Sequence, residues 1–136
     1  DRLKWSLGFT KGVAVDCKGK SGGLALWWRD DVDGTVKPWC QYYIDATIAC
    51  DGTSFRFTGI YGEPCVDKRS WTWDALRYLH TQDNSSWLCA GNFNEARSQD
   101  EQLGGNPRNR GQMEKFEDCL TDCGLADLGL SGYPFT

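Results

Sequence analysis

In the first half of the chain, apolar and polar positions tend to alternate, a spacing typical of β-strands. The clearest run is 41–50, where successive side chains would face opposite sides of a sheet. The dipeptide Asp51-Gly52 follows it and is favoured in tight hairpin turns, so the next run should return beside the first. The pattern as a whole predicts strands at about 13–17, 22–28, 41–49, 54–61 and 87–91.

Two later segments repeat their apolar side chains at helical spacing. In the first helix, at about 67–81, the expected buried stripe is Trp71, Ala75 and Leu79, with Leu76 beside it. In the second, at about 110–123, the expected stripe is Met113, Phe116, Leu120 and Cys123. Gly124 is a natural residue to end the second helix. Polar runs at 30–34 and 97–112 are expected to be a turn and a long surface loop.

Length and composition bound the class of protein. The 136 residues are enough for one domain, and seven Trp, six Phe and five Tyr supply material for a core. No apolar run approaches the roughly 18–20 residues of a membrane span, so no membrane location is expected. Because the chain begins at Asp1 and its only methionine is Met113, we expect a processed or excised chain holding one incomplete domain over residues 1–136.

Charge and cysteine content narrow the partners and the compartment. The net charge of −4 predicts repulsion of phosphates unless a cation or a local basic patch intervenes. Seven cysteines without Cys-x-x-Cys spacing, and a single histidine, favour free thiols in an intracellular compartment, nucleus or cytoplasm, over structural zinc. Five basic residues could form a patch or could be separate solvated charges: Lys68, Arg69, Arg77, Arg108 and Arg110.

The segment 91–95, Gly-Asn-Phe-Asn-Glu, is the most informative part of the chain. It follows the apolar run 87–90, so the side chains of Asn92 and Asn94 are expected at the end of a buried strand, where polar groups can be aimed at a ligand. The segment resembles the Gly-Asp-Phe-Asn signature of the endonuclease/exonuclease/phosphatase superfamily, with Asn92 in place of the aspartate. A structural alternative is that both asparagines cap the turn after the strand.

Four further segments match the same superfamily in order, at 21–26, 56–64, 70–77 and 124–136. In combination they resemble the endonuclease domain of plant non-long-terminal-repeat (LINE-type) retrotransposons. The resemblance implies an α/β fold, namely part of a deoxyribonuclease-I-like four-layer α/β sandwich, in which mixed sheets are flanked by helices.

The resemblance also implies an activity, metal-dependent hydrolysis of DNA phosphodiesters, and three catalytic positions. Tyr61 matches the tyrosine that contacts the scissile phosphate, and Asn94 matches the asparagine that steadies the transition state. Asn92 matches the aspartate that orients or deprotonates the attacking water. The glutamate that holds Mg²⁺ or Mn²⁺ would precede this chain, and the later Asp and Asp-His pair would follow Thr136.

The asparagine at position 92 changes the expected chemistry. An amide has no useful basicity, and its neutral oxygen is a weaker ligand for Mg²⁺ than a carboxylate. We therefore expect a degenerate site that binds no metal strongly, hydrolyses no phosphodiester and binds nucleic acid weakly or not at all.

Two alternatives stay open. The chain could be an active nuclease or phosphatase when further sequence or a partner completes the site. It could also be a co-opted, non-catalytic interaction module, in which an exposed sheet edge pairs with a protein partner or with a second copy.

Overall fold

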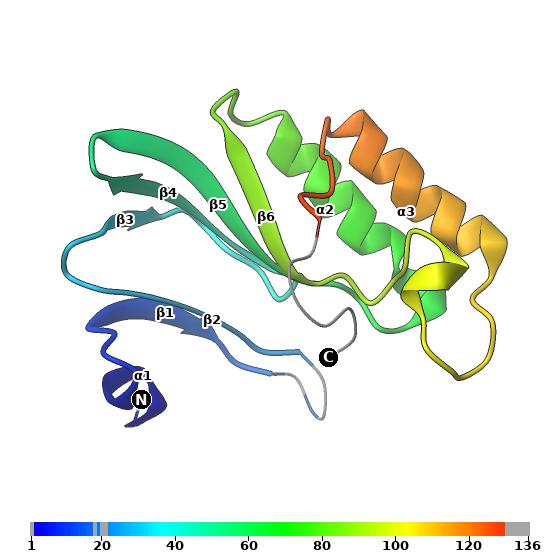
Figure 1. The fold of residues 1–136 in the computed structure, drawn as a ribbon, viewed down its shortest axis with the longest axis horizontal. Coiled ribbons are helices and arrows are strands. Elements are labelled where there is room, and N and C mark those ends of the chain that lie inside the picture. The colour runs from blue at the N-terminus through cyan, green and yellow to red at the C-terminus, as the bar shows by residue number, and fades with distance from the viewer. Residues whose placement is uncertain (1, 18, 20–21, 130–136) are drawn as a thin grey trace.

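The computed structural model describes residues 2–17, 19 and 22–129, and two β-sheets form its framework (Figure 1). The larger sheet has the strand order β3-β4-β5-β6; β3, β4 and β5 are antiparallel neighbours, and β6 runs parallel to β5. The smaller sheet is the antiparallel pair β1–β2. The strands are β1 (Lys11–Val15), β2 (Leu24–Trp28), β3 (Asp33–Val36), β4 (Tyr43–Cys50), β5 (Thr53–Tyr61) and β6 (Trp87–Asn92).

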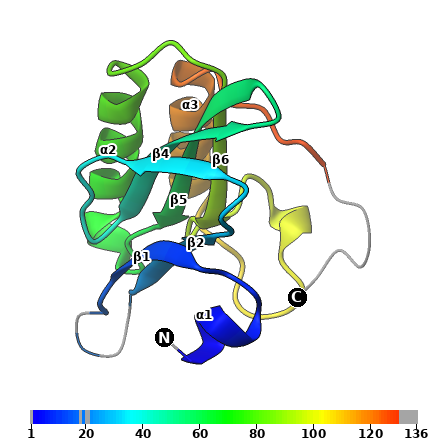
Figure 2. The same cartoon turned by 90° about the vertical axis from the view of Figure 1, so that its left-hand side faces the viewer.

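Helices flank the sheets. Helices α2 (Ser70–His80) and α3 (Arg110–Asp122) lie side by side over one face of the four-stranded sheet, and the β1–β2 pair lies on its other side (Figures 1 and 2). The short helix α1 (Arg2–Ser6) precedes β1, and two 3-10 turns, η1 (Val66–Lys68) and η2 (Gln99–Glu101), lie in the connections. This arrangement confirms the mixed α/β class with two sheets flanked by helices.

The β4–β5 hairpin forms at the predicted dipeptide. Asp51 and Gly52 have φ angles of 51° and 75°, and the strands pair directly on either side of them, Cys50 with Thr53. Positive φ at both turn residues is the geometry that suits the right-handed twist of paired strands. The register that follows aligns Tyr43 with Ile60, so the hairpin prediction is confirmed along the length of both strands.

The core lies between the sheet and the two helices. It is formed by Ile60, Trp73, Leu76, Phe116, Cys119 and Cys123. The rings of Trp73 and Phe116 stack with their centroids 4.8 Å apart and so join α2 to α3. For α3 the structure has the predicted Phe116 and Cys123 buried, with Met113 and Leu120 partly buried.

The predicted stripe of α2 is wrong at Trp71. That side chain is 49% exposed, whereas the buried residues of the helix include Thr72, Trp73 and Leu76. A spacing of four residues drifts away from the 3.6-residue helical period, so a stripe fixed through Leu79 does not extend back to Trp71. The Trp71 ring instead lies at the surface and makes an edge-to-face contact with the ring of Tyr42.

Both ends of α3 are closed by local hydrogen bonds. At the start, the side chain of Asn109 accepts a hydrogen bond from the backbone N–H of Gln112 at 3.2 Å. At the end, Gly124 has φ 64°, and the backbone N–H of Leu125 reaches the carbonyl of Leu120 at 2.9 Å. This is the Schellman arrangement, which confirms the predicted role of Gly124.

Two segments expected to be irregular contain regular structure. The predicted turn at 30–34 gives way at Asp33 to strand β3, which pairs with β4 from Ala49 to Ala46. The predicted loop at 97–112 contains the turn η2 and also the first residues of α3. Strand β3 was not predicted because Asp-Gly-Thr-Val has no clear apolar pattern, and its strand geometry comes from the neighbour it pairs with.

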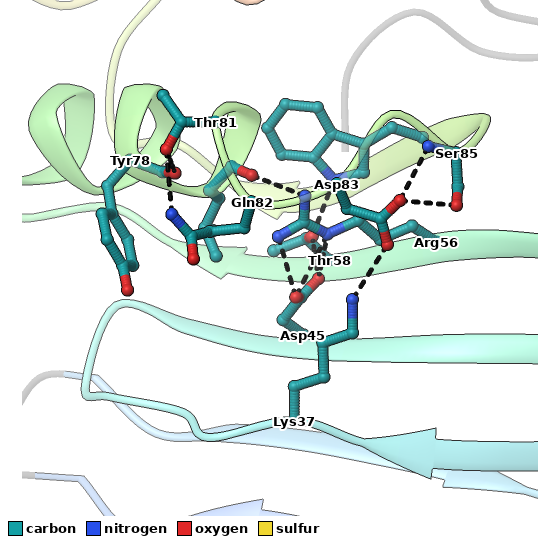
Figure 3. A network of polar contacts seen from close by, with 11 residues as sticks. Lys37, Asp45, Arg56, Thr58, Tyr78, Thr81, Gln82, Asp83 and Ser85 are labelled. Carbon is teal, nitrogen blue, oxygen red and sulfur yellow. Dashed lines mark hydrogen bonds and ion pairs between the residues drawn. The ribbon is translucent and has the colours of Figure 1, made fainter.

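A buried ion pair joins β4 to β5 beneath the end of α2 (Figure 3). The side chains of Asp45 and Arg56 are 2% and 1% exposed, and Arg56 donates to the carboxylate through Nε and Nη2, both at 2.9 Å at their closest. The third nitrogen of Arg56, Nη1, donates to the carbonyl of Leu79 at 2.6 Å. The guanidinium therefore connects two strands to the last turn of a helix.

The same network extends to β6. Thr58 donates its hydroxyl hydrogen to Asp45 at 2.7 Å and accepts one from Trp87 Nε1 at 2.8 Å. The guanidinium carbon of Arg56 lies 5.0 Å from the centroid of the Trp87 ring, which adds a cation–π contact. Because each buried polar group has a partner, the network can be accommodated inside the fold.

Strands β3 and β6 are the outer strands of the larger sheet in the part of the chain that the structure describes. Pairing of a protein partner or a second copy at such an edge stays a prediction. None of the described helices has the length and apolar character needed to cross a membrane.

The seven cysteines are free thiols with different exposure. Cys17 and Cys65 are exposed, whereas Cys119 and Cys123 are buried. Burial raises the pKa of the Cys89 thiol to about 12, and burial likewise raises the pKa of Cys119 to about 12.

This difference predicts an order of alkylation. At mildly alkaline pH, iodoacetamide should modify Cys17 and Cys65 in the folded protein, because they are accessible and the thiolate is the reactive form. Cys89 and Cys119 should react only after denaturant is added. Peptide mass spectrometry of samples quenched over time would measure this order, and modification of Cys119 as fast as Cys65 in the folded protein would contradict it.

Candidate functional site

The predicted site residues come together where β5 and β6 end. Tyr61 and Asn92 are register partners in these parallel strands, and the backbone N–H of Gly62 donates to the carbonyl of Asn92 at 2.7 Å. Parallel neighbours end at the same edge of a sheet, so their last side chains and the loops that follow are close. The third predicted residue, Asn94, lies in the loop directly after β6.

Glycines allow the two strand ends to approach so closely. A Cβ atom on Gly62 would lie 2.2 Å from the carbonyl oxygen of Phe93, and one on Gly91 would lie 2.0 Å from the carbonyl oxygen of Ile60. Gly91 also has φ 141°, which other residues rarely adopt. The Gly that opens the 91–95 segment therefore has a steric role in the sheet.

The two asparagine side chains are used to hold the loop. The Oδ1 atom of Asn92 accepts a hydrogen bond from the backbone N–H of Asn94 at 2.8 Å. Asn94 has φ 55°, and its side-chain amide donates to the carbonyl of Gly62 in the neighbouring loop. The Asn92 side chain thus makes the contact that the structural alternative of turn capping predicts, whereas the Asn94 side chain joins its loop to the one after β5.

A small cavity lies beside Tyr61. It has a volume of about 110 Å³ and is lined by Asp16, Gly22, Gly23, Gln41, Tyr42, Tyr61, Glu63 and Pro64. The hydroxyl of Tyr42 donates to Glu63 at 3.1 Å, and Glu63 also accepts the backbone N–H of Cys65 at 3.0 Å. Burial, with a contribution from Glu63, raises the pKa of Tyr42 above its ordinary value.

Glu63 and Asp16 are the carboxylates of this cavity, and sequence reasoning assigned neither of them a role. The signal for Glu63 was present, because Glu63-Pro64 stands one residue after the strand that ends at Tyr61. Glu63 is nevertheless occupied by two hydrogen bonds within its own surroundings. Within residues 2–17, 19 and 22–129, no three carboxylate, histidine or cysteine side chains are grouped so that they could hold a metal ion.

Glu95, the last residue of the 91–95 segment, is a buried structural anion. Its side chain is fully buried, and its two oxygens lie 2.5 Å from Arg69 Nη1 and 3.5 Å from Arg108 Nη1. Arg69 also donates to the carbonyl of Pro64, and Arg108 donates to that of Asn94. The two arginines therefore tie the loop after β5 and the loop after β6 to one carboxylate.

The five basic residues considered from the sequence do not form one patch. Of the five, Arg69 and Arg108 lie together, because both pair with Glu95. Arg77 pairs with Asp122 and Arg110 pairs with Glu114 at the surface. Lys68 lies over the ring of Trp71, with 5.4 Å between Nζ and the ring centroid.

A larger cavity is separate from the Tyr61 site. Its volume is about 600 Å³, and it lies along β6 between Leu88, Phe116 and Leu128. None of the three predicted catalytic residues lines it.

The chemistry available at the predicted site is limited. Asn92 and Asn94 present amides, which have no useful basicity, and Tyr61 presents a phenol that can donate or accept a hydrogen bond. The arrangement offers hydrogen-bond donors and neutral acceptors to a ligand.

Comparison with known proteins adds no relative. The chain matches no protein-family model, and it matches no curated protein. The resemblance to the endonuclease superfamily therefore depends on the sequence segments named above and stays a prediction.

Proposed function

We propose that this chain is a retroelement-derived, endonuclease-like domain whose ancestral activity was metal-dependent hydrolysis of DNA and whose present site is catalytically inactive. The observation that carries the proposal is the pairing of Tyr61 with Asn92 at one sheet edge, with Asn94 bonded across to Gly62. Three positions named from two segments of one family resemblance are thus neighbours in space, as members of a common site must be.

The finer fold assignment belongs to the same proposal. The two sheets, with α2 and α3 over the outer face of the larger one, support a partial deoxyribonuclease-I-like sandwich (Figure 2). The strand–helix–strand unit β5–α2–β6 supports it further, because it brings the tyrosine loop and the asparagine loop to the same edge.

Inactivity follows from the side chains that are present. Hydrolysis of a phosphodiester needs a base for the attacking water and positive charge for the developing anion. Asn92 cannot supply the first, and its oxygen already accepts the N–H of Asn94. In related chemistry a divalent ion supplies several kcal/mol of charge stabilisation, and amide oxygens alone hold Mg²⁺ poorly.

Asn92→Asp is expected to leave the chain without measurable nuclease activity. The carboxylate can accept the same hydrogen bond from Asn94, so the loop should be preserved while one candidate base is restored. Groups that act as a unit are far from additive, so restoring one member recovers little. Plasmid nicking in Mg²⁺ or Mn²⁺ measures this, with the unmodified chain and Asn92→Asp compared at equal concentration.

Tyr61→Phe and Asn94→Ala are the controls for residual activity. Metal-dependent nicking by the unmodified chain that is lost in either variant would show that the site is still catalytic. Nicking by Asn92→Asp alone would show that the remaining groups suffice for metal binding and for catalysis. The first result would overturn the proposed inactivity, and the second would contradict the expectation for Asn92→Asp.

A further inference from the structure

A third cavity, next to the candidate site, has a basic lining. Its volume is about 320 Å³, and its polar lining includes Arg69, Gln102, Arg108, Asn109 and Gln112. Arg108 donates to the carbonyl of Asn94 at 3.2 Å, so this cavity and the predicted catalytic loop share a wall.

Positive charge exceeds negative charge at this cavity. Arg69 and Arg108 contribute two positive charges, and both pair with the single carboxylate of Glu95. Glu95 is fully buried behind them, and no Asp or Glu is among the described residues that line the cavity. The cavity therefore has a local excess of one positive charge, although the chain as a whole has a net charge of −4.

Guanidinium donors remain unused there. Arg69 has a side chain that is 9% exposed, and its Nε is buried without a hydrogen-bond partner among the described residues. Because this nitrogen is buried and the other two donate to Glu95 and Pro64, Arg69 contributes positive charge to the cavity and no free donor. Arg108 contacts Asn94 and Glu95 through Nη1, and its side chain is 35% exposed. Its Nε and Nη2 atoms are therefore the donors that remain for a ligand.

The N-terminal end of α3 forms part of the cavity wall. Asn109 is the N-cap of this helix of 13 residues, Gln112 lies in its first turn, and both line the cavity. The N–H of Gln112 is already bonded to Asn109, so the helix contributes chiefly the partial positive charge of its N-terminus, which favours anions. The electrostatics of the helix and of the arginines therefore act in the same direction.

We propose that this cavity binds a phosphate group, with Arg108 as its direct donor and Arg69 as supporting positive charge. Arginine suits this ligand because its planar fork matches the geometry of phosphate oxygens. The group could be a free phosphate or a backbone phosphate of DNA. The inference goes beyond the proposed function, because the cavity would bind phosphate whether or not the Tyr61 site catalyses anything.

An amide NMR titration with inorganic phosphate tests the proposal, with sodium chloride at matched ionic strength as the reference. We expect saturable shifts at Arg108, Asn109 and Gln112 in phosphate only. Arg108→Gln should raise the dissociation constant about tenfold, which corresponds to the loss of one good charge-assisted contact. Arg110→Gln is the matched control, because Arg110 is 89% exposed, pairs with Glu114 and does not line the cavity.

Three results would overturn the inference: equal shifts in chloride, shifts that map elsewhere, or equal weakening by Arg108→Gln and Arg110→Gln. The titration of the unmodified chain decides the location even if Arg108→Gln folds poorly. A short DNA duplex forms the second arm. Shifts of the same amides would assign the phosphate to DNA, and phosphate shifts without duplex shifts would assign a small phosphate. A failed nicking assay affects neither readout.

Discussion

Asp45→Ala is expected to lower the free energy of unfolding by about 3–5 kcal/mol, the cost of leaving one partner of a buried ion pair alone. Arg56 is 1% exposed and directs two of its nitrogens at this carboxylate (Figure 3). Thr58 would lose its acceptor as well. Urea denaturation followed by far-ultraviolet circular dichroism measures the change.

The chain provides a matched control in Asp31→Ala. Asp31 accepts Nε and Nη2 of Arg29 at 3.1 and 2.7 Å, the same fork geometry, but both side chains are more than half exposed. Removing an exposed pair should cost about 0–1 kcal/mol. Equal losses from Asp45→Ala and Asp31→Ala would show that burial of the Arg56 network does not matter for stability.

A double variant separates the ion pair from the space that it fills. Asp45→Leu with Arg56→Met removes both charges together, so no unpaired charge stays in the interior. Apolar replacement of a buried pair is often close to neutral, and we expect the double variant to be more stable than Asp45→Ala.

Gly91→Ala is expected to destabilise the fold by about 2–4 kcal/mol, from overpacking together with backbone strain. The new Cβ would lie 2.0 Å from the carbonyl oxygen of Ile60 on the neighbouring strand. Since that atom belongs to the backbone of a paired strand, it cannot move aside cheaply. The variant should therefore separate the ends of β5 and β6, where Tyr61 and Asn92 are paired.

Gly104→Ala controls for strain alone. Gly104 has φ 75°, and a Cβ added there would meet no atom within 4 Å. Gly104→Ala should lower the free energy of unfolding by about 1–2 kcal/mol, the penalty for a side chain in the left-handed region. A loss in Gly91→Ala no greater than that in Gly104→Ala would argue against close packing as the reason for glycine at position 91.

The elements that could be predicted are those whose causes are local. Asp51-Gly52 specifies a tight hairpin because both residues accept positive φ, and the structure has both angles positive. The second helix was predicted from its apolar spacing and from Gly124, and it forms with that residue at its end. In each case the residues that cause the feature are neighbours in the chain.

Elements that depend on a neighbour were predicted less well. Strand β3 exists because β4 pairs with it, and its own four residues carry no strand signal. In α2 the sequence has Trp71 and Trp73 two residues apart, and both are suitable core residues. Which of them is buried depends on how the helix is rotated against the sheet, and that rotation buries Trp73.

The candidate site divides in the same way. The family resemblance named Tyr61, Asn92 and Asn94 as candidates, and the two asparagines also stand just after the apolar run 87–90. The tertiary structure decided that the two strands are parallel neighbours and that the asparagine side chains are bonded within the loops. It also decided the ion pairs Asp45–Arg56 and Glu95 with Arg69 and Arg108. Local conformation follows from adjacent residues, whereas a buried charge finds its partner only once separate elements have packed together.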